Sequence, residues 1–307
     1  MATLICGSLA FDTIMDFEGR FAAQILPDQL HILNVSFLVP NLRRDFGGCA
    51  GNIAYAMKQL GGTPIPMATL GRDGADYMDR LEAQGISTEF VRELSNAYTA
   101  QAMIMTDRDN NQITAFHPGA MMQAHITHIH ARADLRLGIV APDGREAMLQ
   151  HAREFHASGI PFVFDPGQGL PMFDGPALSD LVALASWITV NDYEGRMLCD
   201  RMGVELAELS RQVRGLVVTL GAEGCDLWQA GARVHVPGVQ AAEVVDPTGC
   251  GDAWRGALLY GLEQGWPLER CARVGNRIGA LKVASRGPQN YVVDQGLLDA
   301  IHQSGAV

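Results

Sequence analysis

The 307-residue sequence predicts an α/β fold with a doubly wound, mostly parallel sheet and a small β-sheet lid. Short apolar runs alternate with segments of helical periodicity, which is the βαβ pattern of a parallel sheet covered by helices on both faces. Two stretches, residues 13–46 and 97–117, interrupt this alternation. Because two such insertions can pair into one small sheet over the larger one, they predict a lid within a single domain spanning residues 1–307.

The runs expected to form strands are short and recur along the chain. They cover residues 4–8, 65–70, 137–141, 161–165, 187–190 and 216–220. The segments expected to form helices lie between them, at residues 53–60, 75–84, 145–158 and 193–201. Within residues 97–117, side chains alternate in polarity on both sides of residues 107–111, which predicts a β-hairpin.

Composition limits the class of protein. The chain is 48% hydrophobic and 19% charged, with a net charge of −11 and scattered basic residues. This balance excludes nucleic acid and anionic membranes as partners and leaves a small molecule as the expected ligand. Six cysteines without a C-x-x-C pair predict reduced thiols and a cytoplasmic location. The N-terminus reads as a first strand, with no signal peptide, and no apolar run is long enough to span a membrane.

Residues 244–262, VVDPTGCGDAWRGALLYGL, join an apolar pair to a glycine-rich turn and then to a helical pattern. Val244 and Val245 predict a strand, and the apolar positions from Trp254 to Leu262 recur at helical spacing. The glycines let backbone N–H groups approach a ligand closely, and a helix N-terminus attracts anions. Asp252, on the first helical turn, fits either a simple N-cap or a base beside a phosphoryl group.

Two other phosphate-binding motifs do not match this stretch. A Walker A loop needs G-x-x-x-x-G-K-[ST], which occurs nowhere in the chain. A dinucleotide fingerprint needs a third glycine at the position where Trp254 stands. The turn is therefore interpreted as an anion cradle with a carboxylate beside it.

The segment Asp246-Pro-Thr-Gly-Cys-Gly-Asp252 resembles the D-T-x-G-A-G-D signature of the PfkB, or ribokinase-like, family of small-molecule kinases. The second family signature is present as Gly47-Gly-Cys-Ala-Gly-Asn52. Further matches, in order along nearly the whole chain, are Gly7-Ser8 with Asp12, Gly71-Arg-Asp-Gly74, Asn191-Asp-Tyr-Glu194 and Thr219-Leu-Gly221-Ala-Glu-Gly224. The resemblance implies a doubly wound α/β domain with a β lid, and a kinase that uses ATP and Mg²⁺.

The resemblance also implies a role for each matching position. Asp252 matches the catalytic base, and Gly249, Cys250 and Gly251 match the anion hole. Asp12, Gly48 and Asn52 match positions that bind sugar hydroxyls of the acceptor. Asn191 and Glu194 match the N-x-x-E motif that organises magnesium and phosphate, while Thr219, Gly221, Gly224 and Asn276 match the wall of the ATP site. Asp246, Thr248, Ser285, Gly287 and Tyr291 fall where the family often coordinates a monovalent cation such as K⁺.

Within the family, residues 116–121, 165–168 and 191–194 look most like prokaryotic nucleoside and adenosine kinases, which implies purine salvage. This narrower resemblance adds Phe116 and Gln168 to the expected substrate site and makes the 5′-hydroxyl of a ribonucleoside, such as adenosine or inosine, the acceptor. A slot for the nucleobase could be lined by Met103, Met105, Phe116, Met121 and Met122, and these side chains could equally form the core of the small sheet.

Three departures from the family pattern bear on function. Pro247 replaces a threonine and removes one N–H, outside the run that forms the anion hole. Cys250 replaces a smaller residue, which a hole built from backbone donors tolerates. Cys49 replaces the lysine of ribokinases and argues against free ribose as substrate.

Two alternatives remain open. One is a sugar kinase, either a ribokinase or a fructokinase, and the other, from a different class, is a non-catalytic ligand-sensing member. Retention of Asp252 argues against the second. The sequence does not decide the oligomeric state and is compatible with a homodimer.

Overall fold

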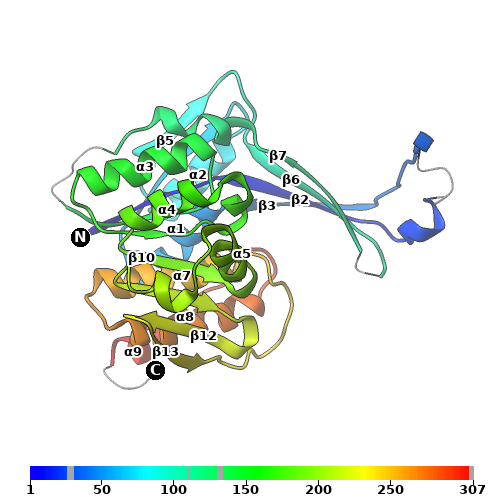
Figure 1. Ribbon diagram of the computed structural model, residues 1–307. Coiled ribbons are helices and arrows are strands. Elements are labelled where there is room, and N and C mark those ends of the chain that lie inside the picture. Colours follow the sequence, from blue (N-terminus) through cyan, green and yellow to red (C-terminus); the bar gives the residue numbers. More distant parts are fainter. Residues whose placement is uncertain (26–30, 110, 130–133, 304–307) are drawn as a thin grey trace.

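The computed structural model describes residues 1–25, 31–109, 111–129 and 134–303 (Figure 1). The body of the protein is built on a nine-stranded sheet in the order β13-β12-β11-β10-β9-β8-β1-β4-β5. Neighbouring strands from β11 to β5 are parallel, and β12 and β13 are antiparallel at one edge. The strands are β1 (Ala2–Cys6), β4 (Pro64–Gly71), β5 (Phe90–Leu94), β8 (Leu135–Val140), β9 (Phe162–Phe164), β10 (Trp187–Asn191), β11 (Gly215–Thr219), β12 (Gly224–Gln229) and β13 (Ala232–Pro237). This architecture confirms the predicted fold class.

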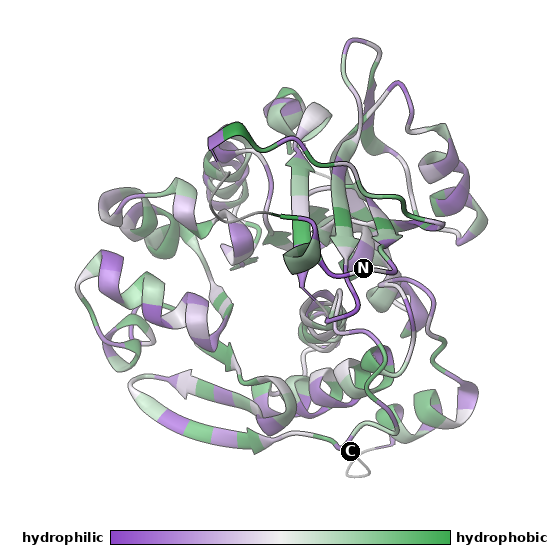
Figure 2. Cartoon of the chain, turned by 90° about the vertical axis from the view of Figure 1, so that its right-hand side faces the viewer, coloured by the Kyte–Doolittle hydropathy of each residue, from purple (hydrophilic) through white to green (hydrophobic). Residues whose placement is uncertain are grey.

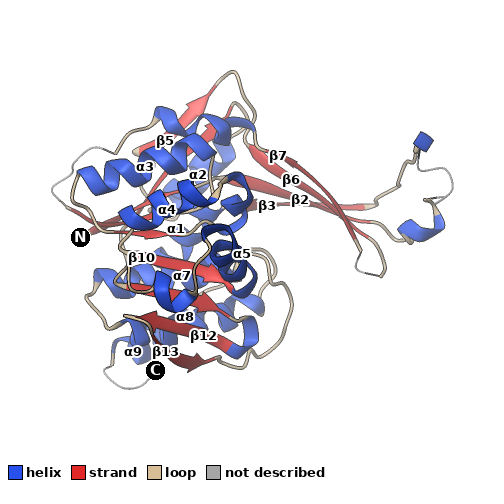
Figure 3. Cartoon of the chain, in the orientation of Figure 1, coloured by secondary structure: helices blue, strands red, loops and turns tan. Residues whose placement is uncertain are grey.

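Helices cover both faces of this sheet (Figure 3). They are α1 (Cys49–Gln59), α2 (Ala75–Ala83), α3 (Arg145–Ala157), α4 (Gly175–Leu184), α5 (Asp192–Met202), α6 (Leu206–Leu209), α7 (Cys250–Glu263), α8 (Leu268–Val283) and α9 (Gln295–His302). Helices α1, α7 and α8 share one apolar core, whereas α3 and α4 pack into a second. Ile5 joins the first core and Leu4 the second, because successive side chains of a buried strand point to opposite faces.

Buried strands give the sheet its apolar character, and the hydrophobic colouring in Figure 2 runs along the strands at the centre of the body. Every predicted strand of the sheet is present within a few residues of its expected bounds, as are the four predicted helices. Among the described residues, no helix combines the length and the apolar character that a bilayer crossing requires.

The chain reverses its winding direction between β1 and β8. It proceeds from β1 to β4 and β5 on one side, and from β8 through β9 and β10 to β11 on the other. In doubly wound sheets, ligands bind outside the carboxyl ends of the strands at such a switch point. Ser8 lies there, just after β1. Its hydroxyl accepts a hydrogen bond from the N–H of Cys49 at 3.2 Å, and its own N–H donates to Pro142 O at 3.1 Å.

A four-stranded sheet, β3-β2-β6-β7, extends to one side of the body (Figure 1). Its strands are β2 (Ala10–Asp16), β3 (Asn41–Gly47), β6 (Ala100–Thr106) and β7 (Gln112–His117). Strands β6 and β7 form the predicted hairpin, whose turn is closed by the Asp107 carboxylate accepting from the N–H groups of Asp109 and Asn111 at 2.9 Å. The other insertion, residues 13–46, contributes most of β2 and β3 and the short helix η1 (Phe21–Ala23) in its described part.

The predicted strand at Val244 and Val245 is wrong. Both residues lie in a loop without regular secondary structure, and Val244 is 77% exposed. The N–H of Val245 donates to Val283 O at 2.8 Å at the end of α8, so this backbone is tied to a helix terminus rather than to a neighbouring strand. Two β-branched residues favour strand formation, but a segment becomes a strand only when its backbone can pair with the edge of a neighbouring strand.

Candidate active site

The glycine-rich turn leads directly into α7. Gly249 has a left-handed backbone (φ 76°), and a Cβ at this position would lie 2.6 Å from Pro288 Cβ, so no other residue fits without a shift. Gly249 is also the N-cap residue of α7, without a capping side chain. The alternative in which Asp252 serves as a simple N-cap is therefore wrong. Its carboxylate is free for another role on the first turn.

The Asp252 carboxylate is half-buried and held by a chain of polar side chains. Its Oδ2 accepts a hydrogen bond from Asn52 Nδ2 at 2.8 Å. Asn52 is oriented in turn by Gln289, whose amide donates to Asn52 Oδ1 at 3.0 Å and to the Tyr77 hydroxyl at 2.8 Å. Burial raises the pKa of Asp252, while Arg255, Asn52 and Cys49 act in the opposite direction. The chain thus joins the N-terminal ends of α1 and α7.

Close packing of α1 against α7 brings these ends together. A Cβ at Gly256 would lie 2.5 Å from Ala56 Cβ and 2.8 Å from Ile53 O. The absence of a side chain there lets the two helix backbones approach each other one turn after Asp252. Ile53 and Leu258 pack in the same core, which fixes the distance between Asn52 and Asp252.

One guanidinium faces three carboxylates. Arg255 Nη2 donates to Asp165 Oδ1 at 2.8 Å, Arg255 Nε is paired with Asp165 Oδ2, and Nη2 lies 3.8 Å from Glu194 Oε2. Burial raises the pKa of Asp165 to about 7, and Arg255 opposes this shift. Although burial acts against it, the facing carboxylates, Asp165 first among them, raise the pKa of Arg255. Asp252 is the third carboxylate, and the Arg255 charge lowers its pKa.

Asp12 lies on β2, where the small sheet meets the body. Its cross-strand neighbour is Asp45 on β3. Burial, Asp45, Asp252 and Asp246 raise the pKa of Asp12 to about 6. A Cβ at Gly47 would lie 2.5 Å from Asp12 Oδ2, so this glycine provides the room for the carboxylate. The structure therefore brings Asp12, Asn52 and Asp252 close together.

Gly48 lies where β2 and the start of α1 meet, between Asp12 and Asn52. Its backbone φ is 85°, and a Cβ would lie 2.6 Å from both Ala10 N and Ser8 O. Only glycine allows β2 and the start of α1 to approach this closely. This requirement explains the second signature physically.

The register of the small sheet decides which side chains share the face of Asp12. Asp12 pairs with Ala102, and Ala102 pairs with Phe116, so all three point to the same side. Phe116 is 54% exposed there. Met103 and Met105 pair with Thr13 and Met15 and therefore point to the other side. The interpretation that these two methionines line a nucleobase slot is wrong, whereas Phe116 occupies a suitable position.

Three other residues expected near the substrate lie outside the small sheet: Met121, Met122 and Gln168. Met121 is half-buried and Met122 exposed on the short helix η3 (Gly119–Ile126). Gln168 is exposed on η4 (Gly167–Met172), three residues after Asp165. Its side chain is thus accessible near the end of β9.

The N-x-x-E motif forms a capping box at the start of α5. Asn191 Oδ1 accepts from Glu194 N at 2.7 Å, and Glu194 Oε2 accepts from Asn191 N at 2.8 Å. This reciprocal pair satisfies two N–H groups at the helix start. Because Glu194 also faces Arg255, the motif has a structural role that exists without any ligand.

The expected wall of the nucleotide site lies at the carboxyl end of β11. Thr219 ends this strand and Gly221 begins η5 (Gly221–Glu223) with a φ of 60° and open space beside it. A Cβ at Gly224 would lie 2.2 Å from Val236 O, so this glycine permits the turn into β12. Asn276 is buried, and its amide donates to Pro237 O at 2.9 Å and accepts from Trp254 Nε1 at 2.9 Å. Asn276 therefore supports the wall from within, rather than presenting a free amide to a ligand.

The expected monovalent cation site already contains a cation. The buried ammonium of Lys282 donates to Asp246 O at 2.7 Å and to Ser285 O at 3.1 Å. Gly287 contributes its N–H to Asp246 Oδ2 at 2.9 Å, so it acts as a donor and not as an oxygen ligand. Thr248 likewise donates its N–H, to Asp246 Oδ1 at 2.9 Å. These residues as arranged do not fit a bound K⁺.

Tyr291, the fifth expected cation ligand, has a different environment. Its backbone oxygen accepts a hydrogen bond from the Tyr55 hydroxyl. Its own hydroxyl is buried without a partner among the described residues. Tyr291 thus packs as a core side chain beside α1.

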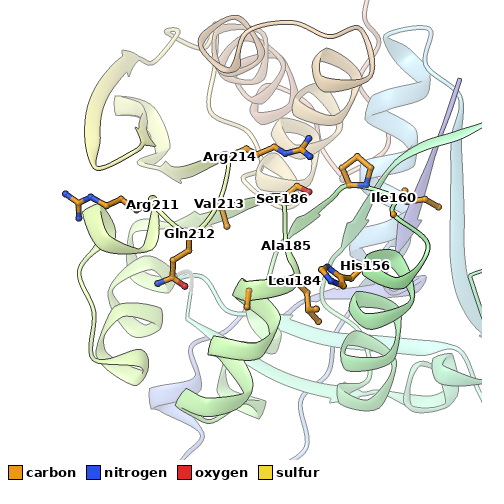
Figure 4. Close-up of a pocket in the computed structure, with 12 residues that line it drawn as sticks. His156, Ile160, Leu184, Ala185, Ser186, Arg211, Gln212, Val213 and Arg214 are labelled. Carbon is orange, nitrogen blue, oxygen red and sulfur yellow. The ribbon is translucent and has the colours of Figure 1, made fainter.

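A hollow of about 470 Å³ lies elsewhere in the body (Figure 4). Ile160, Ser186 and Arg214 line it, and these residues precede β9, β10 and β11. The hollow is therefore at the amino ends of the strands. The candidate site lies at the opposite, carboxyl ends, where this class of fold binds ligands.

Sequence reasoning missed four side chains that support the site: Tyr77, Arg255, Lys282 and Gln289. A signal existed for Arg255, since it follows Asp252 by three residues and therefore shares its helix face. Lys282 interrupts the apolar periodicity of α8 at a buried position. Gln289 and Tyr77 act only through contacts with distant parts of the chain, and no local pattern marks them.

Residues 20–295 match the pfkB family of carbohydrate kinases. A nucleoside kinase from Burkholderia thailandensis, whose structure was solved in complex with inosine, is 52% identical, with a TM-score of 0.87 over 97% of this chain and 96% of that chain. It was also solved with ADP-inosine. A nucleoside kinase from Methanocaldococcus jannaschii is 28% identical over 83% of this chain and 85% of its own length. Mouse ribokinase is also 28% identical, over 80% of both chains.

The family match covers most of the chain and includes strands β3, β6 and β7 of the small sheet and both signatures. The two signatures converge at Asn52 and Asp252, so the matched motifs form one site rather than separate features. The chain belongs to the pfkB family of carbohydrate kinases.

Proposed function

We propose that this protein is an ATP-dependent nucleoside kinase that phosphorylates the 5′-hydroxyl of a ribonucleoside. The observation that carries the proposal is the half-buried Asp252 carboxylate on the first turn of α7, bonded to Asn52 and close to Asp12. A base, an anion cradle and hydroxyl-binding groups then lie within one site. The relative that is 52% identical was solved with inosine, which supports a nucleoside as acceptor.

Asp252 takes the proton from the acceptor hydroxyl in this proposal. The carboxylate must be ionised to do so, and Arg255 and Asn52 favour the ionised form against the effect of burial. The N–H groups of Gly249, Cys250 and Gly251 lie at the start of α7, where the helix dipole stabilises negative charge. In this structure the Cys250 N–H donates to Pro247 O at 3.2 Å. Phosphoryl transfer depends mainly on such positioning and electrostatics.

Magnesium and ATP complete the proposed chemistry. Mg²⁺ usually keeps several water ligands and is held by one or two carboxylates together with substrate phosphates. The described residues contain no preformed group of three metal-binding side chains, which is compatible with a metal that enters with the nucleotide. Glu194, at the edge of the carboxylate cluster, would hold it there, and the ion would supply positive charge against the phosphate groups. Thr219, Gly221 and Gly224 would border the nucleotide.

The substrate specificity is proposed from the two sides of the acceptor site. Asp12, Gly48 and Asn52 would bind the ribose, and Phe116, exposed on the same sheet face as Asp12, would stack on the base. Adenosine and inosine are the expected acceptors, with purine salvage as the expected role. A kinase of free ribose or fructose is the alternative, since ribokinases are among the relatives. A ligand-sensing member is disfavoured because Asp252 and its supporting network are intact.

The test is a comparison of kcat/KM for adenosine, inosine, cytidine, ribose and fructose with ATP and Mg²⁺. The proposal expects a nucleoside to be the best acceptor. A free sugar that outcompetes every nucleoside would leave a kinase of the other substrate class. No ATP-dependent phosphorylation of any of the five, with binding retained, would favour the sensing member.

Other expectations stay predictions. All six cysteines are free thiols, which agrees with the predicted cytoplasmic location. A homodimer remains a prediction. Potassium is not part of the proposed chemistry, because the Lys282 ammonium already occupies two of the oxygens at the expected site.

A further inference from the structure

Lys282 places a positive charge inside the protein. It lies on the last turn of α8 with an exposed fraction of 0%, and its ammonium donates to the backbone oxygens of Asp246 and Ser285. A buried ammonium is tolerated only when it is well bonded and faces negative charge. The chain has two lysines, Lys58 and Lys282, and its other basic side chains of this kind are arginines.

The charges around this ammonium are balanced by fixed side chains. Arg43 pairs with Asp45 at 3.1 Å and lies 3.8 Å from Asp246 Oδ2. Two carboxylates thus face two cations, Arg43 and Lys282. An additional K⁺ would meet two positive groups with no uncompensated carboxylate to attract it.

The ammonium joins three segments next to the anion cradle. It links the Asp246 backbone to Ser285 and to the end of α8, while the Asp246 carboxylate holds the N–H groups of Thr248 and Gly287. Gly249, the N-cap of α7, follows Thr248 directly. The position of the cradle therefore depends on a cation at this point, because the cation holds the carbonyl of the residue from which the turn begins.

We infer that the Lys282 ammonium takes the place of the monovalent cation expected from the family resemblance, so that the enzyme works without potassium. This inference rests on the proposed kinase function. The tethered ammonium is present in every folded molecule, whereas a dissolved ion binds only according to its concentration. Removing the side chain would leave a space lined by backbone carbonyl oxygens, the type of ligand that K⁺ accepts.

The first experiment measures kinase activity of the wild-type enzyme in chloride salts of K⁺, Na⁺ and tetramethylammonium at one ionic strength. The inference expects rates that agree within about twofold, since a difference that small corresponds to well under 1.4 kcal/mol of cation binding. Activation by K⁺ of about tenfold or more over tetramethylammonium would overturn it.

The second experiment uses Lys282→Ala and Lys282→Met, with Lys58→Ala as the matched control. Lys282→Ala should lose about tenfold or more of its activity in tetramethylammonium and regain most of it in K⁺, because two buried carbonyls lose their donor and an ion can replace it. Lys282→Met fills the same space with a neutral chain, so K⁺ should not restore it. Lys58→Ala should behave as wild type. Full activity of Lys282→Ala without K⁺ would overturn the inference.

Two readouts do not depend on turnover and separate this inference from the proposed function. K⁺ should raise the thermal midpoint of Lys282→Ala above that in tetramethylammonium, and leave that of wild type unchanged. In protein labelled with ¹⁵N-lysine, the two ammonium signals can be compared directly. The Lys282 signal should show slower proton exchange with water than that of Lys58, even if both variants fail to fold. Equal exchange rates, or a wild-type midpoint that rises with K⁺, would overturn the inference.

Discussion

Arg255 holds the carboxylates beside the proposed base, so its removal should affect stability and catalysis in separable ways. In Arg255→Gln, the buried Asp165 loses its hydrogen bond and its ion pair with Arg255, and Glu194 and Asp252 lose a facing positive charge. Breaking one side of a buried pair costs roughly 3–5 kcal/mol because the remaining charge is left uncompensated. We expect a loss of unfolding free energy in this range, measured by urea denaturation at pH 7.

The pH dependence of activity should change as well. Arg255 lowers the pKa of Asp252 in the folded protein, so its removal raises that pKa further. The base works only when ionised, and activity is therefore lost as the pH falls through this pKa. The acid limb of kcat/KM should move to higher pH by about one unit or more, the usual effect of a nearby opposite charge.

Two further variants test the reasoning. Arg255→Lys keeps the charge without the bidentate geometry, so the acid limb should stay closer to that of wild type than in Arg255→Gln. The double variant Arg255→Gln/Asp165→Asn removes both members of the pair and should recover part of the lost stability. An unchanged acid limb in Arg255→Gln would refute the electrostatic role. A double variant no more stable than Arg255→Gln would show that the pair is not the source of the loss.

Three predictions concern the other site residues. Asp252→Asn should keep the fold but lower kcat by roughly 10²–10⁴-fold because an amide accepts no proton, and turnover within about threefold of wild type would contradict the assignment. Burial and neighbouring carboxylates raise the pKa of folded Asp12 to about 6, so the ionised side chain lowers stability once the pH has risen through 6. Asp12→Asn should therefore gain about 1–3 kcal/mol of unfolding free energy at pH 7 and little at pH 4. Equal gains at both pH values would argue against this. Phe116→Ala should lower kcat/KM for inosine at least about fivefold more than for ribose, since stacking on the base is worth about 1 kcal/mol or more, and equal losses would exclude a base contact.

Much of the fold was predictable because its signals are local. The strands from β8 to β11 are short apolar runs bounded by turns, and each is buried on both faces in the structure. The same logic failed at Val244 and Val245, where the N–H of Val245 bonds to the end of α8 and not to a neighbouring strand. Strand formation depends on a neighbour, which a local pattern does not contain.

The candidate site also has features that the sequence predicts and features that it does not. The glycines were predictable as conformational requirements, and Gly48 and Gly249 both adopt positive φ. The bonds that orient the reactive groups were not, because Gln289 meets Asn52 across 237 residues and Arg255 meets Asp165 across 90. The register of the small sheet likewise decided that Phe116 shares a face with Asp12 and Met103 does not. A one-residue shift of that register would have reversed the result.

Fixed cations face several carboxylates of the site and its surroundings. Asp165 and Glu194 face Arg255, and Asp45 and Asp246 face Arg43, with Lys282 next to the Asp246 backbone. Although burial acts against it, the N–H groups of Gly287 and Thr248 hold the pKa of Asp246 below its usual range.

Burial raises the pKa of Asp12 and of Asp252, as it raises that of Asp165. Asp12 is surrounded by Asp45, Asp252 and Asp246, each of which raises its pKa further. Carboxylates in this condition gain most from hydroxyl donors and from a metal ion brought by a nucleotide. Asp12 is thus the acceptor-side carboxylate whose pKa is raised by three neighbouring carboxylates, whereas Arg255 and Asn52 partly compensate Asp252, and the proposed function assigns both groups to the acceptor.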